Sequence, residues 1–180
     1  VPEGDQLYTG LKKIKYENYE DNSHFTSTQE ELEAALACEP NGAFLGSSYY
    51  RTPFPISLWV WNAFSESTSG AGKWISKTFG KPPVLMSWVN PASVAQNTLK
   101  NNGYFQGRVK YEVLTQKNPK KAKIGYSVSV GPLYTLDSVA YLNFPPEITQ
   151  LIASRASISK LQKGSAFSVS SLDTERNRIS

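Results

Sequence analysis

A stretch near the middle of the chain, residues 99–142, constrains the fold more than any other part of the sequence. Gly103 follows a helical spacing of apolar and small residues, and a glycine at that place ends a helix in the left-handed conformation. Two segments with alternating apolar residues follow, at residues 109–113 and 124–130. The lysine-rich turn at Asn118-Pro119 joins them. The stretch therefore predicts a helix followed by a β-hairpin.

A break and a new extended segment come directly after the hairpin. Gly131-Pro132 ends the second strand, and alternating residues from Leu136 to Leu142 begin another. The order strand, helix, loop, helix occurs once from Leu7 and again from Tyr134, which indicates two consecutive units of similar design.

The N-terminal part predicts one strand and one helix. Residues 7–16 are expected to form the strand, and the acidic, polar residues 17–26 a loop. Ser27 or Thr28 is expected to open the helix, with a glutamate three residues later completing a capping box. Pro40-Asn41-Gly42 then ends this helix.

Residues 40–90 are rich in aromatic residues, proline, glycine and serine, and show no single period. They precede a helix that Asn90 is expected to cap, with Pro91 at its first position. One interpretation is that the aromatic residues fold back and enlarge the core of the first unit. The other is an exposed patch, including Trp59, Trp61 and Phe64, that contacts a partner or the membrane interface.

The chain carries 19 basic and 15 acidic residues, a net charge of +4. The basic residues gather at residues 12–15 and 117–123, which suits solvated strand ends and a turn, or a site for phosphate-rich partners. Cys38 is expected to be a buried thiol rather than a nucleophile, because His24, the one histidine, lies in a polar segment.

The sequence gives little support to catalysis. One histidine and one cysteine cannot make a zinc site, and no phosphate-binding glycine motif is present. We therefore expect a protein that is not an enzyme and has no cofactor or metal. The longest apolar run, residues 56–64, is too short for a membrane-spanning helix. The chain starts with valine, without a visible signal peptide, and is expected to be part of a longer protein.

The order helix, Gly-Tyr-Phe, strand, turn, strand, Gly-Pro, strand resembles the POTRA modules of the outer-membrane assembly superfamily that includes BamA and TamA. The resemblance is strongest over residues 73–141. The matching residues are Leu99, Gly103, Tyr104 and Phe105, the run Val128-Ser129-Val130-Gly131-Pro132, and then Tyr134, Leu136, Asp137 and Val139.

In detail the chain is similar to the TamA-like lipoprotein branch of Bacteroidetes. This similarity is carried by VPEG at residues 1–4, by LWVWN at residues 58–62, and by Trp74, Phe79-Gly80 and Pro82-Pro83-Val84. A comparably long insertion between the two helices of a module appears in that branch.

The resemblance implies an α+β fold of tandem β-α-α-β-β modules, each with a small mixed three-stranded sheet against two helices. Residues 1–6 would be a linker, residues 7–132 the first module with residues 40–90 inserted, and residues 133–180 the N-terminal half of a second, truncated module. The family's exposed edge strand corresponds to a stretch that includes Arg108, Val109, Lys110, Tyr111, Glu112 and Val113. A client polypeptide would pair with this edge, unless the insertion covers it or it is merely solvated.

The same resemblance implies a place at the periplasmic face of the bacterial outer membrane, with unfolded outer-membrane proteins as clients and a TamB-like protein as partner. A membrane β-barrel would follow the chain, and a lipidated cysteine would precede Val1. The alternative hypothesis is a basic α/β domain that binds nucleic acid through the turn at residues 117–123. No nucleic acid is expected under the first hypothesis.

Overall fold

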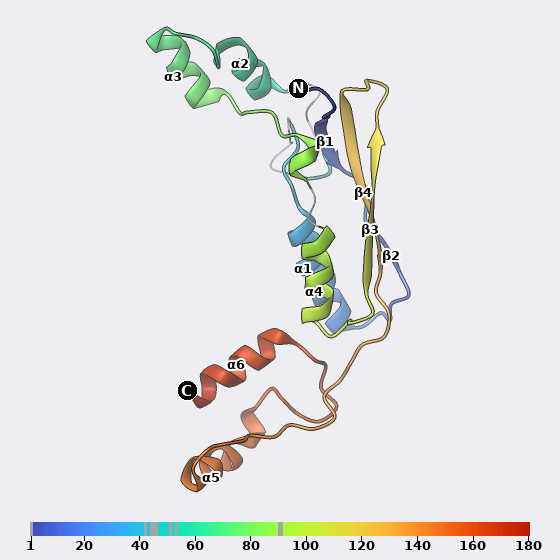
Figure 1. Ribbon diagram of the computed structural model, residues 1–180, viewed down its shortest axis with the longest axis vertical. Helices are drawn as coiled ribbons and strands as arrows, with labels where there is room; N and C mark the ends of the chain where they lie inside the picture. Colours follow the sequence, from blue (N-terminus) through green and yellow to red (C-terminus); the bar gives the residue numbers. More distant parts are fainter. Residues whose placement is uncertain (1, 42, 44–46, 51, 53, 90–91) are drawn as a thin grey trace.

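The structure is a computed structural model that describes residues 2–41, 43, 47–50, 52, 54–89 and 92–180 (Figure 1). The described parts form an elongated molecule with a sheet and two helices in its middle. A helical hairpin lies at one end, and the C-terminal helices lie at the other (Figure 1). The expected α+β class is confirmed by this arrangement.

Strand β4 (Lys121–Ser129) is the centre of the sheet. Strand β3 (Arg108–Thr115) pairs with it in antiparallel fashion, from Arg108 opposite Ser129 to Thr115 opposite Ala122. Strands β1 (Leu7–Leu11) and β2 (Lys15–Glu17) both run parallel to β4 on its other side. The sheet is therefore mixed. It is three strands wide, because β1 and β2 follow one another along the same side of β4.

The expected single first strand is in fact two short strands. Gly10 has a φ of +129°, and the register with β4 shifts between Tyr8 and Leu11, as at a β-bulge. A side chain at Gly10 would approach the carbonyl oxygen of Ser48 to 3.2 Å, so glycine permits this close contact. The shift ends regular pairing at Leu11, and pairing resumes only at Lys15.

Helices α1 (Ser23–Leu36) and α4 (Ala92–Asn101) cover the same face of the sheet (Figure 1). The alternate residues of β4 that face them are almost completely buried, because they fill the space between sheet and helices. The helices contribute apolar side chains at helical spacing, including Leu32, Leu36 and Leu99. The buried residues of β4 and its C-terminal extension are Ala122, Ile124, Tyr126, Val128 and Val130.

Helix α1 begins at Ser23, four or five residues before the predicted start, so the predicted capping box at Ser27 or Thr28 is wrong. The Asn22 side chain accepts a hydrogen bond of 2.8 Å from the Phe25 amide and caps the helix there. Burial explains the earlier start, because Phe25 stacks on Tyr19 and fills the core. The hydroxyl of Thr28 instead donates to the carbonyl of His24 within the helix.

Helix α4 ends as the sequence predicts. Gly103 has a φ of +87°, and the Tyr104 amide donates to the Leu99 carbonyl at 2.9 Å, closing the helix end. The predicted cap at Asn90-Pro91 lies outside the described residues.

The insertion contains helices α2 (Ile56–Phe64) and α3 (Gly70–Phe79) and the 3₁₀ turn η1 (Met86–Trp88). Its last part joins the core, where Val84, Met86 and Val89 pack against the sheet. Helices α2 and α3 instead pack on each other and project away from the sheet (Figure 1). The end of the insertion therefore enlarges the core, as the first interpretation expects, whereas α2 and α3 remain outside the core.

The C-terminal region comprises helix α5 (Pro146–Ser154), the 3₁₀ turn η2 (Ala156–Ile158) and helix α6 (Val169–Ile179). It joins the central part through backbone hydrogen bonds from the Tyr134 amide to the Gly103 carbonyl and from the Phe167 amide to the Tyr134 carbonyl, both 2.9 Å long. None of the described helices has the length and apolar character needed to cross a membrane.

Candidate functional site

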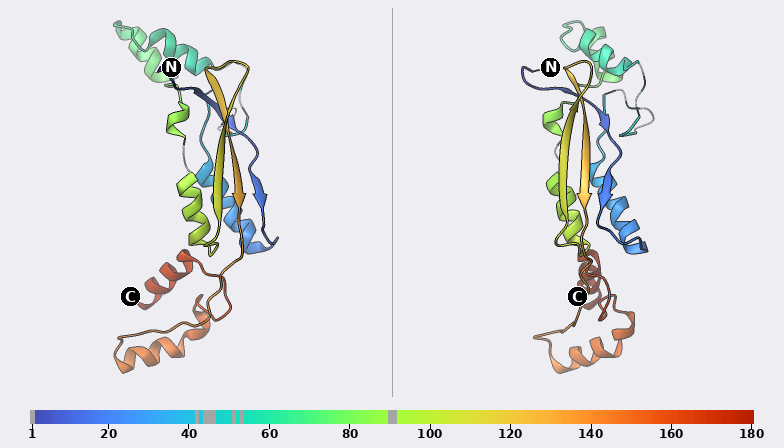
Figure 2. Two further views of the ribbon diagram at one scale, coloured as in Figure 1. Left: turned by 45° about the vertical axis from the view of Figure 1, so that its right-hand side comes forward. Right: turned by 90° about the vertical axis from the view of Figure 1, so that its right-hand side faces the viewer.

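Strand β3 forms one edge of the sheet, as Figure 2 shows in the view onto the sheet. Its inner side pairs with β4 over eight consecutive residue pairs without a bulge. No segment among the described residues pairs with its outer side. The insertion therefore does not occupy this edge in the part of the chain that the structure describes.

The pairing pattern identifies which main-chain groups point outward. The Gln116 amide donates to the Lys121 carbonyl at 2.9 Å, and hydrogen-bonded pairs alternate along an antiparallel ladder. The even-numbered residues of β3 therefore bond to β4. On the far side of β4, the Lys12 amide donates to the Ile124 carbonyl at 2.8 Å, in agreement with this alternation. The outward N–H and C=O groups belong to Val109, Tyr111, Val113 and Thr115.

The side chains of these same residues lie on the helix-covered face of the sheet, each beside its buried cross-strand partner on β4. Val109 is half-buried, yet Tyr111 and Val113 remain 49% and 46% exposed. The ten residues of α4 span only about 15 Å, whereas the eight residues of β3 span about 26 Å. Helix α4 covers the beginning of β3, and an apolar ledge with unpaired main-chain groups remains along the rest.

The opposite face of β3 carries charged side chains. Arg108, Lys110 and Glu112 are exposed there, and Glu112 lies 3.8 Å from the ammonium group of Lys12. An exposed pair of this kind adds little stability. A lysine on an edge strand discourages accidental pairing with other sheets. These charged side chains keep the edge solvated. Neither a proline nor a bulge in β3 blocks the pairing of another strand.

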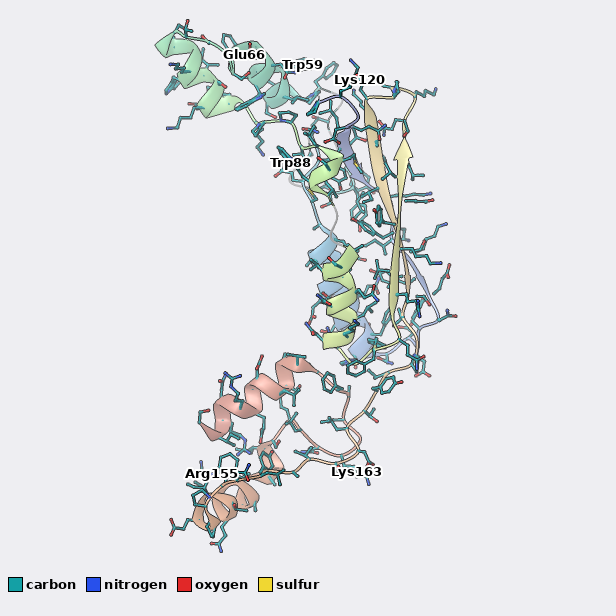
Figure 3. The ribbon with its side chains drawn as sticks, in the orientation of Figure 1. Trp59, Glu66, Trp88, Lys120, Arg155 and Lys163 are labelled. Carbon is teal, nitrogen blue, oxygen red and sulfur yellow. The ribbon has the colours of Figure 1, made fainter. Side chains whose placement is uncertain are left out.

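The aromatic residues of the predicted patch lie on α2, and Figure 3 shows one of them, Trp59, at the end of the molecule where α2 and α3 lie. Trp59 and Phe64 are exposed, whereas Trp61 is half-buried. The backbone of Trp61 lies against Gly80, where an added Cβ would come within 3.2 Å of it. The three residues thus do not form one flat surface.

The lysines of residues 117–123 surround the turn between β3 and β4. Lys117 and Lys120 are exposed, while Lys121 and Lys123 lie within β4 and are half-buried. Figure 3 places Lys120 at the same end of the molecule as Trp59 and Trp88.

Cys38 and His24, which the sequence does not favour as a catalytic pair, lie far apart. Cys38 is half-buried, and burial raises the pKa of its thiol. His24 lies at the opposite end of α1, about 20 Å away by helix length, and a ring nitrogen lies 2.8 Å from the carbonyl oxygen of Asn102. In the described residues, no three histidine, cysteine or acidic side chains are grouped as a metal site would require.

One polar cluster in the C-terminal region was not anticipated from the sequence. Glu175 is only 3% exposed, accepts a 2.5 Å hydrogen bond from the Tyr141 hydroxyl and pairs with the guanidinium group of Arg178. The hydrogen bonds from Arg178 are the main reason that the pKa of Glu175 falls to about 2. The spacing of Glu175 and Arg178 on a helix was the available signal.

The sequence was compared with known proteins. No model of a protein family matches it, and no curated protein does. A crystal structure of POTRA domains 3–5 of BamA from Haemophilus influenzae matches 99% of the chain at 16% sequence identity and a TM-score of 0.43. The chain covers 55% of that protein chain, about half its length. A similarity at this level supports no conclusion about function, and the α+β class follows from the sheet and helices themselves.

Proposed function

We propose that the chain binds polypeptide segments by strand addition along the outer side of β3. The unpaired edge carries this proposal, because the N–H and C=O groups of Val109, Tyr111, Val113 and Thr115 point away from β4. Main-chain pairing tolerates many client sequences, which suits a receptor for unfolded chains. The apolar ledge of Tyr111 and Val113 would receive alternate apolar side chains of the added strand.

The sequence resemblance described above supports a more specific role. In that role the chain is the periplasmic POTRA region of an outer-membrane protein assembly or translocation factor. Residues 7–132 and 133–180 would be consecutive modules, and the factor would belong to the TamA-like lipoprotein branch. Its clients would be unfolded outer-membrane proteins, with a TamB-like periplasmic partner. This role involves no catalysis.

Hydrogen exchange of individual amides tests the strand addition directly. The probe is a synthetic ten-residue peptide of alternating apolar and polar residues, the pattern of a membrane-barrel strand. Without peptide, the amides of Val109, Tyr111 and Val113 should exchange fast, since they point to solvent. With peptide they should become protected, whereas the amides of Lys110 and Glu112 should be protected in both states.

Two substitutions at one position provide matched controls. Val113→Pro removes an outward N–H without touching the ladder to β4, so peptide binding should weaken at least about tenfold while the sheet persists. Val113→Ile keeps the main-chain groups and the branched side chain, and should bind as the unmodified chain does. Unchanged exchange at the three outward amides in saturating peptide, or equal binding by both variants, would contradict the proposal.

The alternative, binding of nucleic acid, would use the open face of the sheet and the adjoining turn. This face carries Lys15, Lys110 and Lys123 but no aromatic side chain on β3 or β4 for base stacking. Strong, salt-dependent binding to a duplex of random sequence would favour this alternative over strand addition.

A further inference from the structure

The part of the insertion that leaves the core, residues 54–81, is called here the aromatic hairpin. We propose that the aromatic hairpin lies in the interface of a lipid bilayer that contains anionic lipids. The proposal does not depend on strand addition at β3, because the two surfaces share no residue.

Helix α2 is apolar on every side, and the structure covers it only in part. Its sequence, ISLWVWNAF, contains two polar residues and no charged residue. None of its residues is buried, even though one side faces α3. A helix that is hydrophobic all round is normally buried in a protein core or in lipid. Since the described chain leaves every residue of α2 at least partly exposed, an apolar medium from outside would complete its covering.

The largest exposed side chains of the aromatic hairpin and the adjoining turn are of the type that favours a membrane interface. Trp59 is 53%, Trp74 62% and Trp88 64% exposed, and Phe79 is 57% exposed. Tryptophan is enriched at headgroup level, where its ring is apolar and its N–H remains near water. These side chains come from three elements, α2, α3 and η1.

Charge also favours lipid headgroups as the partner. The aromatic hairpin contains Lys73, Lys77 and Lys81 against one acidic residue, Glu66. The carboxylate of Glu39 pairs with Lys81 at 2.9 Å, whereas Lys73 and Lys77 are exposed cations that form no ion pair with the described residues. Lys120, in the turn between β3 and β4, lies at the same end of the molecule (Figure 3). Aromatic and basic residues together are typical of helices that lie on anionic membranes.

Intrinsic fluorescence provides a selective test, because all four tryptophans of the chain lie in the aromatic hairpin or in η1. The protein is mixed with vesicles of phosphatidylcholine and phosphatidylglycerol at a ratio of about three to one. We expect the emission to shift to shorter wavelength, and brominated lipids to quench it. Vesicles of phosphatidylcholine alone should bind more weakly, by about fivefold for each lysine that contacts the headgroups.

Variants that retain every tryptophan locate the contact. Ile56→Ser and Phe79→Ser each remove an exposed apolar side chain from the aromatic hairpin and should lower vesicle affinity about tenfold, since neither residue lies in the core. Ile158→Ser changes a similarly exposed residue in η2, at the opposite end of the molecule, and should leave vesicle binding unchanged. Circular dichroism should show the same fold for all three variants.

Three results would overturn the proposal. The first is an emission spectrum that no vesicle changes. The second is quenching by brominated lipid that Ile56→Ser and Phe79→Ser leave intact. The third is a blue shift that grows with protein concentration in the absence of vesicles, which would identify a second copy of the chain as the occupant. None of these results affects the exchange of the β3 amides, so this proposal and strand addition fail or stand separately.

Discussion

At the scale of single residues, the core contains three tyrosines whose hydroxyl groups are buried without a hydrogen-bond partner in the described chain: Tyr8, Tyr16 and Tyr126. Burial raises the pKa of each phenol well above its usual range. A desolvated hydroxyl without a partner is unfavourable. The rings of these residues fill space at the core, and we expect their hydroxyl groups to add nothing to its stability.

Replacing one such residue tests this conclusion. Tyr126→Phe keeps the ring and removes the unpartnered hydroxyl, so the free energy of unfolding should stay constant or rise by about 1 kcal/mol. Urea denaturation followed by circular dichroism measures the change. The matched control is Tyr141→Phe, which removes the hydroxyl that donates to Glu175 and should destabilise the C-terminal region. A clear loss of stability in Tyr126→Phe would show that its hydroxyl is satisfied in solution.

The buried Glu175 predicts an acid-sensitive C-terminal region. Its pKa is lowered from 4.5 to about 2, mainly by hydrogen bonds from Arg178, so the ionised form stabilises the folded state. This stability is complete above pH 4.5 and should be lost as the pH falls toward 2. Nuclear magnetic resonance signals of α6 should then lose dispersion before those of the sheet. Glu175→Gln should remove this pH dependence, and an unchanged dependence in that variant would assign it to another group.

At the scale of elements, the sequence was most informative where local pattern and tertiary packing agree. The position of β3 follows from the alternation at residues 109–113, and the end of α4 follows from Gly103. The start of α1 could not be predicted in this way. The local sequence favours a cap at Ser27 or Thr28, but burial of Phe25 extends the helix toward the N-terminus, to Ser23. Likewise, the free outer side of β3 depends on the strand order, and the exposure of Tyr111 and Val113 depends on the length of α4. The residues of β3 encode neither.

The two possible caps of α1 can be compared by substitution. Asn22→Ala removes the side chain that accepts from the Phe25 amide, so it should lower the free energy of unfolding by about 1 kcal/mol. Ser27→Ala lies inside the helix and should be neutral or slightly stabilising, because alanine has the higher helix propensity. Thermal denaturation measures both. The reverse order of effects would place the functioning cap at Ser27.

At the scale of the whole molecule, a small aromatic contact holds the C-terminal region against the central part. Phe105, which follows the end of α4, packs on Tyr134 and Phe167, with ring centroids 5.3 and 5.0 Å apart. Gly103 lies directly beneath this contact, where an added Cβ would be 2.9 Å from the carbonyl oxygen of Phe167. The end of one helix therefore also positions the next part of the chain.

Removing the contact should loosen the junction without unfolding either part. Phe105→Ala eliminates both ring contacts, and small-angle X-ray scattering should show a broader distribution of interatomic distances. Tyr50→Ala, which removes a largely exposed ring elsewhere, is the control and should leave the scattering unchanged. Identical scattering from Phe105→Ala and the unmodified chain would mean that the backbone hydrogen bonds alone fix the junction.

The central position of β4 also determines when this protein can fold during its synthesis. Each of β1, β2 and β3 pairs with β4, and β4 is the last strand of the sheet to be translated. Leu7 must wait for Lys121 before it has a partner, a separation in sequence that is typical of slow folding. The nascent chain therefore has no complete sheet until the ribosome has passed residue 129. The β3–β4 hairpin should then form first, and the N-terminal strands, although the first to be made, should be the last to join.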